Sequence, residues 1–250
     1  METNNEYRLV PTFGDSFGTG WRVMIDNFLR LFLVVIVLAI LTAPLKMLDF
    51  KFNANDFNDL PFIGNAFHGD LRHLFTLGSL GILAAFFGLI ALLYALLVAP
   101  VFTYGGDMIF VQSVRKIKPD FEYLIKGFME NYFHIVLASL LVTALTIMGF
   151  FLLIIPGIII ACRLVFVSYI VMDKKLDPIE AVELSWRLTR GHTWKIFFMG
   201  FVSIFIFFFG LLMLIVGIFP AIMWVSSSFA ALYESVLREK EPAVAIAPAI

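Results

Sequence analysis

The stretch LLIIPGIII, residues 152–160, lies inside an uncharged run that extends from Ile135 to Cys162. An α-helix needs about 20 apolar residues to cross a bilayer, and this run is longer than one crossing requires. Proline has no backbone N–H and is favoured in the first turn of a helix. Pro156 and Gly157 are therefore expected to end one span and begin the next, as a tight transmembrane hairpin.

Three other runs contain no Asp, Glu, Lys or Arg: Leu31–Leu45, Leu74–Gly106 and Ile196–Tyr233. Charged residues make up 15% of the chain, against about 25% in soluble proteins. Pro220 divides the last run as Pro156 divides the first. We therefore predict an all-α integral membrane protein with six transmembrane helices, at residues 29–47, 74–99, 132–155, 157–173, 194–217 and 220–237.

Basic residues predict the orientation, because cytoplasmic loops carry an excess of Lys and Arg. With six spans, 14 of the 18 Lys and Arg residues lie on the side of both termini, three lie on the other side, and Arg163 lies within the membrane. Both termini are therefore expected in the cytoplasm. The first thirty residues are too polar for a secretory signal, so the first span is expected to stay uncleaved.

The segment DPIEAVELSWRLTRGHTW, residues 177–194, has the pattern of an amphipathic helix. Asp177 suits the N-cap, Pro178 the first helical position, and Glu180 a capping box, while Gly191 can end the helix. Its charged side chains fall within one narrow arc of the helix. We expect an interfacial helix with Trp186 at the depth of the lipid headgroups, inserted between neighbouring spans. The residues of the charged arc are Glu180, Glu183, Arg187 and Arg190.

Two further segments resemble this one and precede other odd-numbered spans, namely FGTGWRVMIDNF and FEYLIKGFMENY. Each even-numbered span is followed by a basic cluster and a proline, in RKIKP, DKKLDP and REKEP. These matches predict a threefold internal repeat of one interfacial amphipathic helix plus one hairpin, at 11–118, 119–177 and 178–241. An outer loop at 48–73 enlarges the first repeat, and 242–250 forms a short tail. Chance similarity among cytoplasmic loops is the alternative.

From about residue 119 to residue 237 the sequence resembles a bacterial membrane family. This family comprises the membrane domain attached to some glycerophosphodiester phosphodiesterases and its stand-alone YciC-like relatives of unknown function. The resemblance implies a six-helix protein of the cytoplasmic membrane with no agreed activity; the phosphodiesterase domain is a separate soluble barrel for which 250 residues leave no room. The matching positions are Pro156, Gly157, Arg163, Asp173, Ala181, Ser185, Trp186, Thr189, Gly191 and Trp194.

Arg163 is the leading candidate for a functional residue. It follows the outer turn by seven positions, which places it roughly 10 Å deep in the membrane. An arginine at that depth costs about 2.5–3.5 kcal/mol on insertion scales and suggests a function by default. Asp107 and Glu234 are its expected partners. Two interpretations stay open: a structural ion pair, or a contact with an anionic headgroup or substrate.

Other candidates are weaker. His68, Asp70 and His73 of FHGDLRH could begin a zinc site, but no fourth ligand or base lies nearby in the sequence. No strand precedes the glycines near the N-terminus, so nucleotide binding is not expected. Cys162 is the only cysteine and is expected to be a core residue. We expect no metal and no cofactor. No catalytic constellation is visible, so no enzymatic activity is expected; a membrane-embedded hydrolase is the alternative.

The broken helices, the repeats and Arg163 together favour a protein that binds, positions or transports a lipid-like or small amphipathic molecule. The alternative is a non-transporting scaffold or assembly partner of a membrane complex, favoured by the small number of buried charges. Membrane lipids are the expected partners in the first case and other membrane proteins in the second. Nucleic acid is not expected.

The topology can be tested directly. Reporter tags at residues 3 and 245 should both report the cytoplasm, and a cysteine introduced at position 58 should react with a membrane-impermeant reagent from outside. Labelling of either terminus from outside would overturn the six-span prediction.

Overall fold

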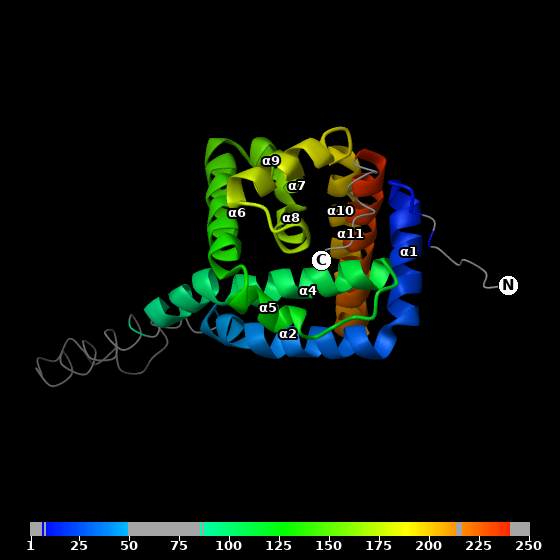
Figure 1. Ribbon diagram of the computed structural model, residues 1–250, viewed down its shortest axis with the longest axis horizontal. Helices are drawn as coiled ribbons and strands as arrows, with labels where there is room; N and C mark the ends of the chain where they lie inside the picture. Colours follow the sequence, from blue (N-terminus) through cyan, green and yellow to red (C-terminus); the bar gives the residue numbers. More distant parts are fainter. Residues whose placement is uncertain (1–6, 8, 50–85, 87, 214–216, 241–250) are drawn as a thin grey trace, which may run out of the picture. The chain divides into compact units, whose positions relative to one another are not determined.

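The computed structural model describes residue 7 and residues 9–49, 86, 88–213 and 217–240, all of which form helices or the turns between them (Figure 1). The outer loop from residue 50 to residue 73, the tail at 242–250, and half of the predicted second span at 74–99 lie outside these described residues, while residues 48 and 49 still belong to α2. The chain divides into two compact units, one formed by 1–38 with 100–250 and the other by 39–99. In the smaller unit the Tyr94 hydroxyl donates a 2.6 Å hydrogen bond to the carbonyl of Leu41.

A short helix precedes a long one at each of the three places where the sequence predicted an amphipathic segment before a span. The bounds are α1 Phe13–Asp26, α2 Phe28–Asp49, α4 Ala99–Val114, α5 Tyr123–Met129, α6 Tyr132–Leu152, α7 Ile154–Leu164, α8 Val167–Lys174, α9 Pro178–Thr189, α10 Thr193–Leu212 and α11 Ile218–Lys240. Short α1, α5 and α9 coincide with the three predicted amphipathic segments.

Four helical segments of the described chain are long and apolar enough to cross a membrane, and α1 with α2 would add a fifth if this pair, bent by 95°, forms one span. The second span was predicted at 74–99, but the apolar helix in this region reaches Val114. A turn at Val98 interrupts the helix, so Pro100 lies in the first turn of α4, where proline is tolerated. The four segments are Gly88–Val114, Tyr132–Leu152, Ile154–Lys174 and Thr193–Leu212.

Helix α11 is the most enclosed long helix of the larger unit. From Ala221 to Leu237 thirteen of its side chains are buried, and α1, α10 and α9 pack against it. Figure 1 shows α1 and α10 lying beside it. With its serines and Glu234, α11 is less apolar than the four candidate spans. A helix surrounded by other helices does not need a lipid-compatible surface, so the sixth span stays a prediction.

Helix α1 packs along α11 through aromatic side chains. The indole of Trp224 donates a 3.0 Å hydrogen bond to the carbonyl of Phe17. The rings of Phe17 and Trp21 both meet Trp224 edge to face. Phe17 is buried, and Trp21, one turn later on the same face, is partly exposed. The apolar face of this amphipathic segment therefore serves helix packing.

Two hairpins close by glycine-to-glycine contact. Between α6 and α7 a Cβ on Gly149 would lie 3.1 Å from the Cα of Gly157, and between α10 and α11 a Cβ on Gly210 would lie 2.8 Å from the carbonyl oxygen of Gly217. The first turn lies at Leu153, which is extended, so Pro156 falls inside the first turn of α7 and does not mark the boundary itself. The tight hairpin expected in this stretch is therefore present, three residues earlier than predicted.

The glycine contact of the second hairpin predicts opposite effects for two alanine substitutions in the same helix. Gly210→Ala should lower the free energy of unfolding by about 1–3 kcal/mol, because the new methyl group meets backbone atoms. Gly200→Ala, whose Cβ would meet nothing within 4 Å, should raise it by up to about 1 kcal/mol through helix propensity. Thermal unfolding in detergent measures both; equal shifts would contradict the hairpin contact.

Candidate functional site: a broken helix, a pocket and an ion-pair network

The fourth predicted span is broken, and the break exposes a backbone carbonyl. Helix α7 ends at Leu164 and α8 begins at Val167, so the carbonyl of Arg163 is among the last four of its helix, which lack intrahelical donors. The hydroxyl of Ser185 donates to this carbonyl at 2.8 Å. The Thr189 hydroxyl lies 3.4 Å from the same carbonyl but donates its proton to the carbonyl of Ser185 at 2.8 Å. One side chain of α9 thus replaces the missing backbone donor.

Small residues bring α9 close to the break. Ala181, Ser185 and Thr189 recur every fourth residue and therefore lie on one face of the helix, and all three are fully buried, as is Leu188. This face packs against α7 and α8. The pattern that carried the family resemblance is explained, for these positions, by packing and by capping of the Arg163 carbonyl.

The start and end of α9 were predicted correctly, but its capping box does not form. Pro178 is the first residue of the helix, and Gly191 has φ +92°, a left-handed conformation that favours glycine. Asp177 occupies the N-cap position without a side-chain capping bond. Its carboxylate instead pairs with Nε2 of His134 at 2.9 Å.

The Arg163 side chain pairs with neither of its expected partners. Its guanidinium carbon lies 4.8 Å from the centroid of the Trp186 ring, a cation–π contact. Its Nε is buried and has no hydrogen-bond partner among the described residues. Trp186 is 43% exposed, so the expectation that it inserts between neighbouring spans was wrong: the ring covers Arg163 from the outside.

Arg163, Arg190 and Lys240 form a cluster of positive charge at the end of α9, here called the α9 cation cluster. The ammonium of Lys240 donates to the carbonyls of Arg187 and Arg190 at 2.9 and 2.6 Å. Burial lowers the pKa of Lys240, and the charges of Arg190 and Arg163 lower it further, against the opposing charge of Glu239. Three cations thus lie near one carboxylate, that of Glu239, so this end of α9 has an excess of positive charge.

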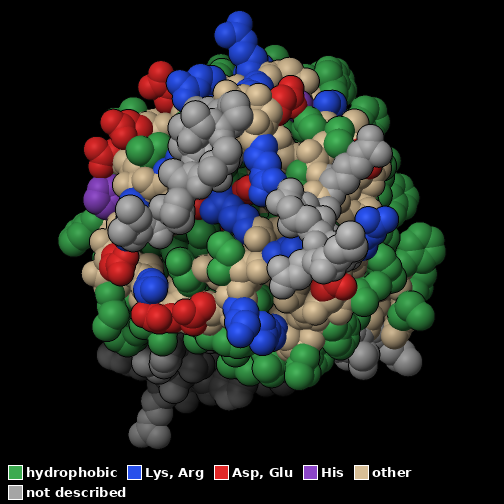
Figure 2. Space-filling model, turned by 45° about the vertical axis from the view of Figure 1, so that its right-hand side comes forward, with side chains coloured by type: hydrophobic (Ala, Val, Ile, Leu, Met, Phe, Trp, Pro, Cys, Tyr) green, Lys and Arg blue, Asp and Glu red, His purple; other side chains and the backbone are tan. Residues whose placement is uncertain are grey.

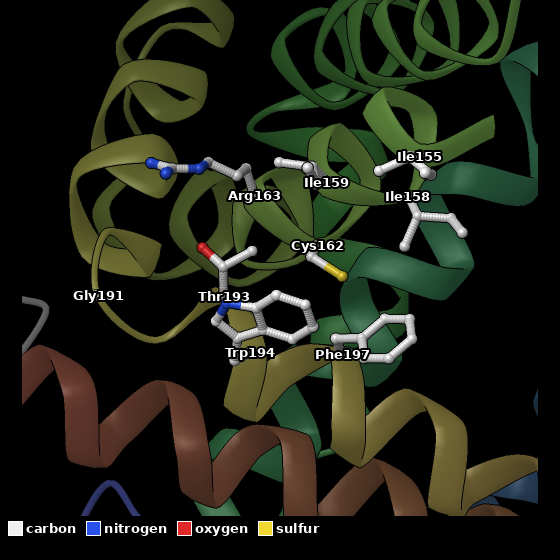
Figure 3. Close-up of a pocket in the computed structure, with 9 residues that line it drawn as sticks. All are labelled: Ile155, Ile158, Ile159, Cys162, Arg163, Gly191, Thr193, Trp194 and Phe197. Atoms are coloured by element: carbon white, nitrogen blue, oxygen red, sulfur yellow. The ribbon is translucent and has the colours of Figure 1, made fainter. Parts of the chain in front are cut away.

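An apolar pocket of about 600 Å³ lies between α7 and α10. Figure 3 shows the Arg163 side chain at its edge, with the guanidinium directed toward α9 and away from Cys162. Cys162 is half-buried and lines the pocket, so it is not the core residue that was expected. The other lining residues are Ile155, Ile158, Ile159, Gly191, Thr193, Trp194 and Phe197.

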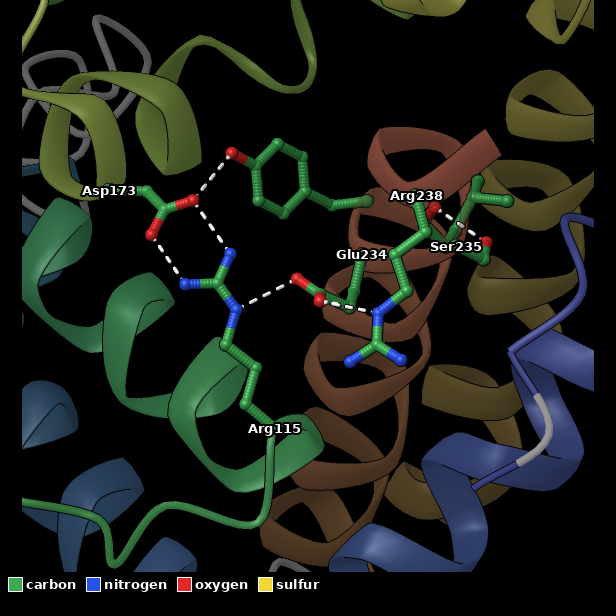
Figure 4. Close-up of polar contacts among 7 residues, drawn as sticks. Arg115, Asp173, Glu234, Ser235 and Arg238 are labelled. Carbon is green, nitrogen blue, oxygen red and sulfur yellow. Dashed lines mark hydrogen bonds and ion pairs between the residues drawn. The ribbon is translucent and has the colours of Figure 1, made fainter. Parts of the chain in front are cut away.

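A second polar feature joins the ends of α4, α8 and α11 (Figure 4). Arg115 donates two hydrogen bonds to Asp173, at 2.5 and 2.7 Å, and a third to Glu234 at 2.8 Å. The Tyr233 hydroxyl donates to Asp173 at 3.0 Å, and Arg238 donates to the other oxygen of Glu234 at 2.9 Å. These contacts form the Arg115 network.

The Arg115 network is largely withdrawn from solvent, since Asp173 is 7% and Glu234 0% exposed. Burial alone would lower the pKa of Arg115, but the hydrogen bonds and charges of Asp173 and Glu234 raise it above its ordinary value. Glu234 was expected to pair with Arg163 and instead pairs with Arg115 and Arg238.

Arg115 was missed in the sequence because it was counted as one residue of a basic loop. Its position could have indicated a structural role, because Arg115 directly follows the apolar helix that ends at Val114. Asp107, the other expected partner of Arg163, lies in a separate polar pocket beside Ser168. The histidines and the aspartate of the outer loop, His68, Asp70 and His73, lie outside the described residues.

The Arg115 network predicts a large loss of stability when one partner is removed. Asp173→Ala should lower the free energy of unfolding by about 3–5 kcal/mol, because it leaves the buried Arg115 charge short of its main partner. The matched control is Glu130→Gln, which removes the exposed ion pair to Lys175 and should leave the melting temperature nearly unchanged. A small effect of Asp173→Ala would show that Arg115 finds water instead.

His192 predicts a pH dependence. Its imidazole is buried, with Nε2 3.3 Å from Glu239, and burial followed by the charge of Lys195 lowers its pKa below 6.5 despite Glu239. Below pH 6.5 the unfolded chain therefore takes up this proton first, and stability should fall as the pH drops from 6.5 to the folded-state pKa. His192→Gln should remove this component, measured as the difference in melting temperature between pH 8 and pH 5. An unchanged difference would contradict it.

Comparison with known proteins adds nothing to the description of this site. No family model, no curated protein and no solved structure matches this chain. The resemblance to the membrane domain of glycerophosphodiester phosphodiesterases and to YciC-like proteins therefore stays a prediction.

Proposed function

We propose that this protein is a six-span protein of the bacterial cytoplasmic membrane, with both termini in the cytoplasm, and that it binds and positions a lipid-like anionic amphiphile in the pocket between α7 and α10. The alternative is a scaffold that holds other membrane proteins without binding such a molecule. The helices that could cross a membrane are the general basis for the proposal.

The pocket is the observation that carries the proposal. Its lining is mostly apolar, and isoleucine and aromatic side chains make up five of its nine residues. Its volume of about 600 Å³ lies within the range of sites for small molecules. It lies between two segments that could cross a membrane. An acyl chain would fit such a lining, since it offers only apolar surface.

The edge of the pocket supplies the positive charge that the anionic end of an amphiphile would need. Arg163 contributes its aliphatic stem to the pocket and its charge to the α9 cation cluster. The unpartnered Nε of Arg163 is a buried donor that an acceptor oxygen would satisfy. Apolar lining and positive edge together favour a molecule with one hydrocarbon end and one anionic end.

Several features support the proposed repeat. The hairpins α6–α7 and α10–α11 both close by a glycine pair and both follow a short helix. Two of the basic clusters contain a lysine in the left-handed conformation, Lys116 with φ 58° and Lys175 with φ 51°. In the view of Figure 2, charged side chains are numerous on the face in view, with hydrophobic side chains around its rim.

The single cysteine provides the experiment. N-ethylmaleimide should alkylate Cys162 in detergent-purified protein, and phosphatidylglycerol should slow this reaction several-fold more than phosphatidylcholine, because the lipid covers the pocket. Intact-mass spectrometry measures the rate. Arg163→Gln should abolish the difference between the two lipids.

Two tryptophan variants serve as a matched pair. Ile158→Trp should fill the pocket and remove lipid protection, whereas Ile204→Trp, on an exposed face of α10, should leave it intact. If neither lipid slows the alkylation of Cys162 in the unmodified protein, the amphiphile site is wrong and the scaffold is favoured.

A further inference from the structure

A second cavity of the larger unit is polar and lies within the candidate spans. It measures about 320 Å³ and is lined by residues of α4, α6, α7 and α8 together with the link between the last two. Its polar side chains are Tyr104, Asp107, Thr146 and Ser168. Asp107 precedes Arg115 by eight positions, so it lies about 12 Å further along the helix than the Arg115 network.

This cavity is separate from the amphiphile pocket. None of its lining residues lines the other pocket. Helix α7 contributes to both, with Ile158 and Cys162 on one side and Ala161 and Leu164 on another. An argument about Asp107 therefore stands whether or not the amphiphile binds.

Asp107 has polar neighbours but no cationic partner among the described residues. The hydroxyl of Ser168 donates a hydrogen bond to its carboxylate. The titratable groups that face it are two phenols, Tyr104 on its own helix and Tyr169 on α8, and Thr146 faces the cavity from α6. Asp173 of the Arg115 network, in contrast, accepts two bonds from a guanidinium.

A lone carboxylate in such surroundings requires a positive charge. Asp107 is only partly exposed. An ionised carboxyl group that is largely withdrawn from water without a counter-charge is disfavoured, and ionisable residues inside a membrane mark ion and proton sites. The lining offers oxygen ligands only, which suit a hard cation. A volume of about 320 Å³ also exceeds the roughly 30 Å³ that one water molecule occupies in the liquid.

We propose that Asp107 is the anionic ligand of a monovalent-cation site within the membrane, which holds either a proton or a sodium ion. The two occupants share one function, neutralising the carboxylate, and differ in what they need. A proton needs the carboxylate alone, whereas sodium also uses neighbouring hydroxyl oxygens. Those of Thr146 and Ser168 line the cavity from α6 and α8.

The test compares the melting temperatures of the full-length wild type and Asp107→Asn in detergent. Both are measured from pH 5 to pH 9, in sodium chloride or in choline chloride at equal ionic strength. At pH 9 in choline chloride the wild type carries an unneutralised carboxylate that the asparagine variant lacks. The melting temperature of Asp107→Asn should therefore equal or exceed that of the wild type under these conditions. As the pH falls, the melting temperature of the wild type should rise relative to that of the variant, by roughly 3–5 °C per pH unit at most.

Sodium distinguishes the two occupants. If sodium binds, it should stabilise the wild type at pH 9, the variant should not respond, and Thr146→Val should weaken the response. If only a proton binds, sodium and choline should give the same wild-type curve. Glu180→Gln, an exposed acid, is the control and should follow the wild type throughout.

One result overturns the proposal: wild type and Asp107→Asn respond identically to pH and to sodium. A second measurement covers the case in which the variant does not fold. The wild type should then show the infrared carbonyl band of a protonated carboxyl group that disappears at high pH or on addition of sodium, and the absence of any such band across the pH range would reject the site. Failure of lipid protection at Cys162 leaves this result unaffected.

Discussion

The carbonyl of Arg163 imposes the constraint on which the surrounding structure depends. A helix that breaks between Leu164 and Val167 must satisfy its last carbonyls, and within a bilayer no water would do so. The hydroxyl of Ser185 reaches this carbonyl only because α9 packs against the break. That packing in turn places Trp186 over the guanidinium of Arg163 and Gly191 at the edge of the pocket. The need to satisfy one backbone carbonyl is thus linked to the position of a whole helix.

Local features of this fold were readable from the sequence, and long-range pairings were not. Proline, glycine and uncharged runs predicted the hairpin near Pro156, the start of α9 at Pro178 and its end before Gly191, because each depends on neighbouring residues. The partners of Glu234 could not be predicted in this way. Arg115 is 119 positions away, and periodicity does not report which helix ends meet. Trp186 was misplaced because an aromatic residue on an amphipathic helix can cover either a neighbouring span or a single cation.

Helix α7 separates two cavities of different chemistry. On one side isoleucine and aromatic side chains line a pocket whose edge is positive. On the other, hydroxyl groups surround a carboxylate. The sequence pointed to Arg163 and Asp107 as one ion pair because both lie next to uncharged runs. In the structure Arg163 and Asp107 line different cavities, and α7 contributes residues to both.

The fork of Arg115 has a mechanical consequence. Its three hydrogen bonds connect the ends of α4, α8 and α11, and the stacked rings of Tyr169 and Tyr233 lie directly behind this junction. These three helix ends are therefore expected to move together, since separating Arg115 from Asp173 or from Glu234 breaks a charge contact that is largely withdrawn from solvent. The mouth between α7 and α10 has no such clamp among its lining residues. A movement that opens the bundle should therefore separate α7 from α10, while the helix ends joined by the Arg115 network stay together.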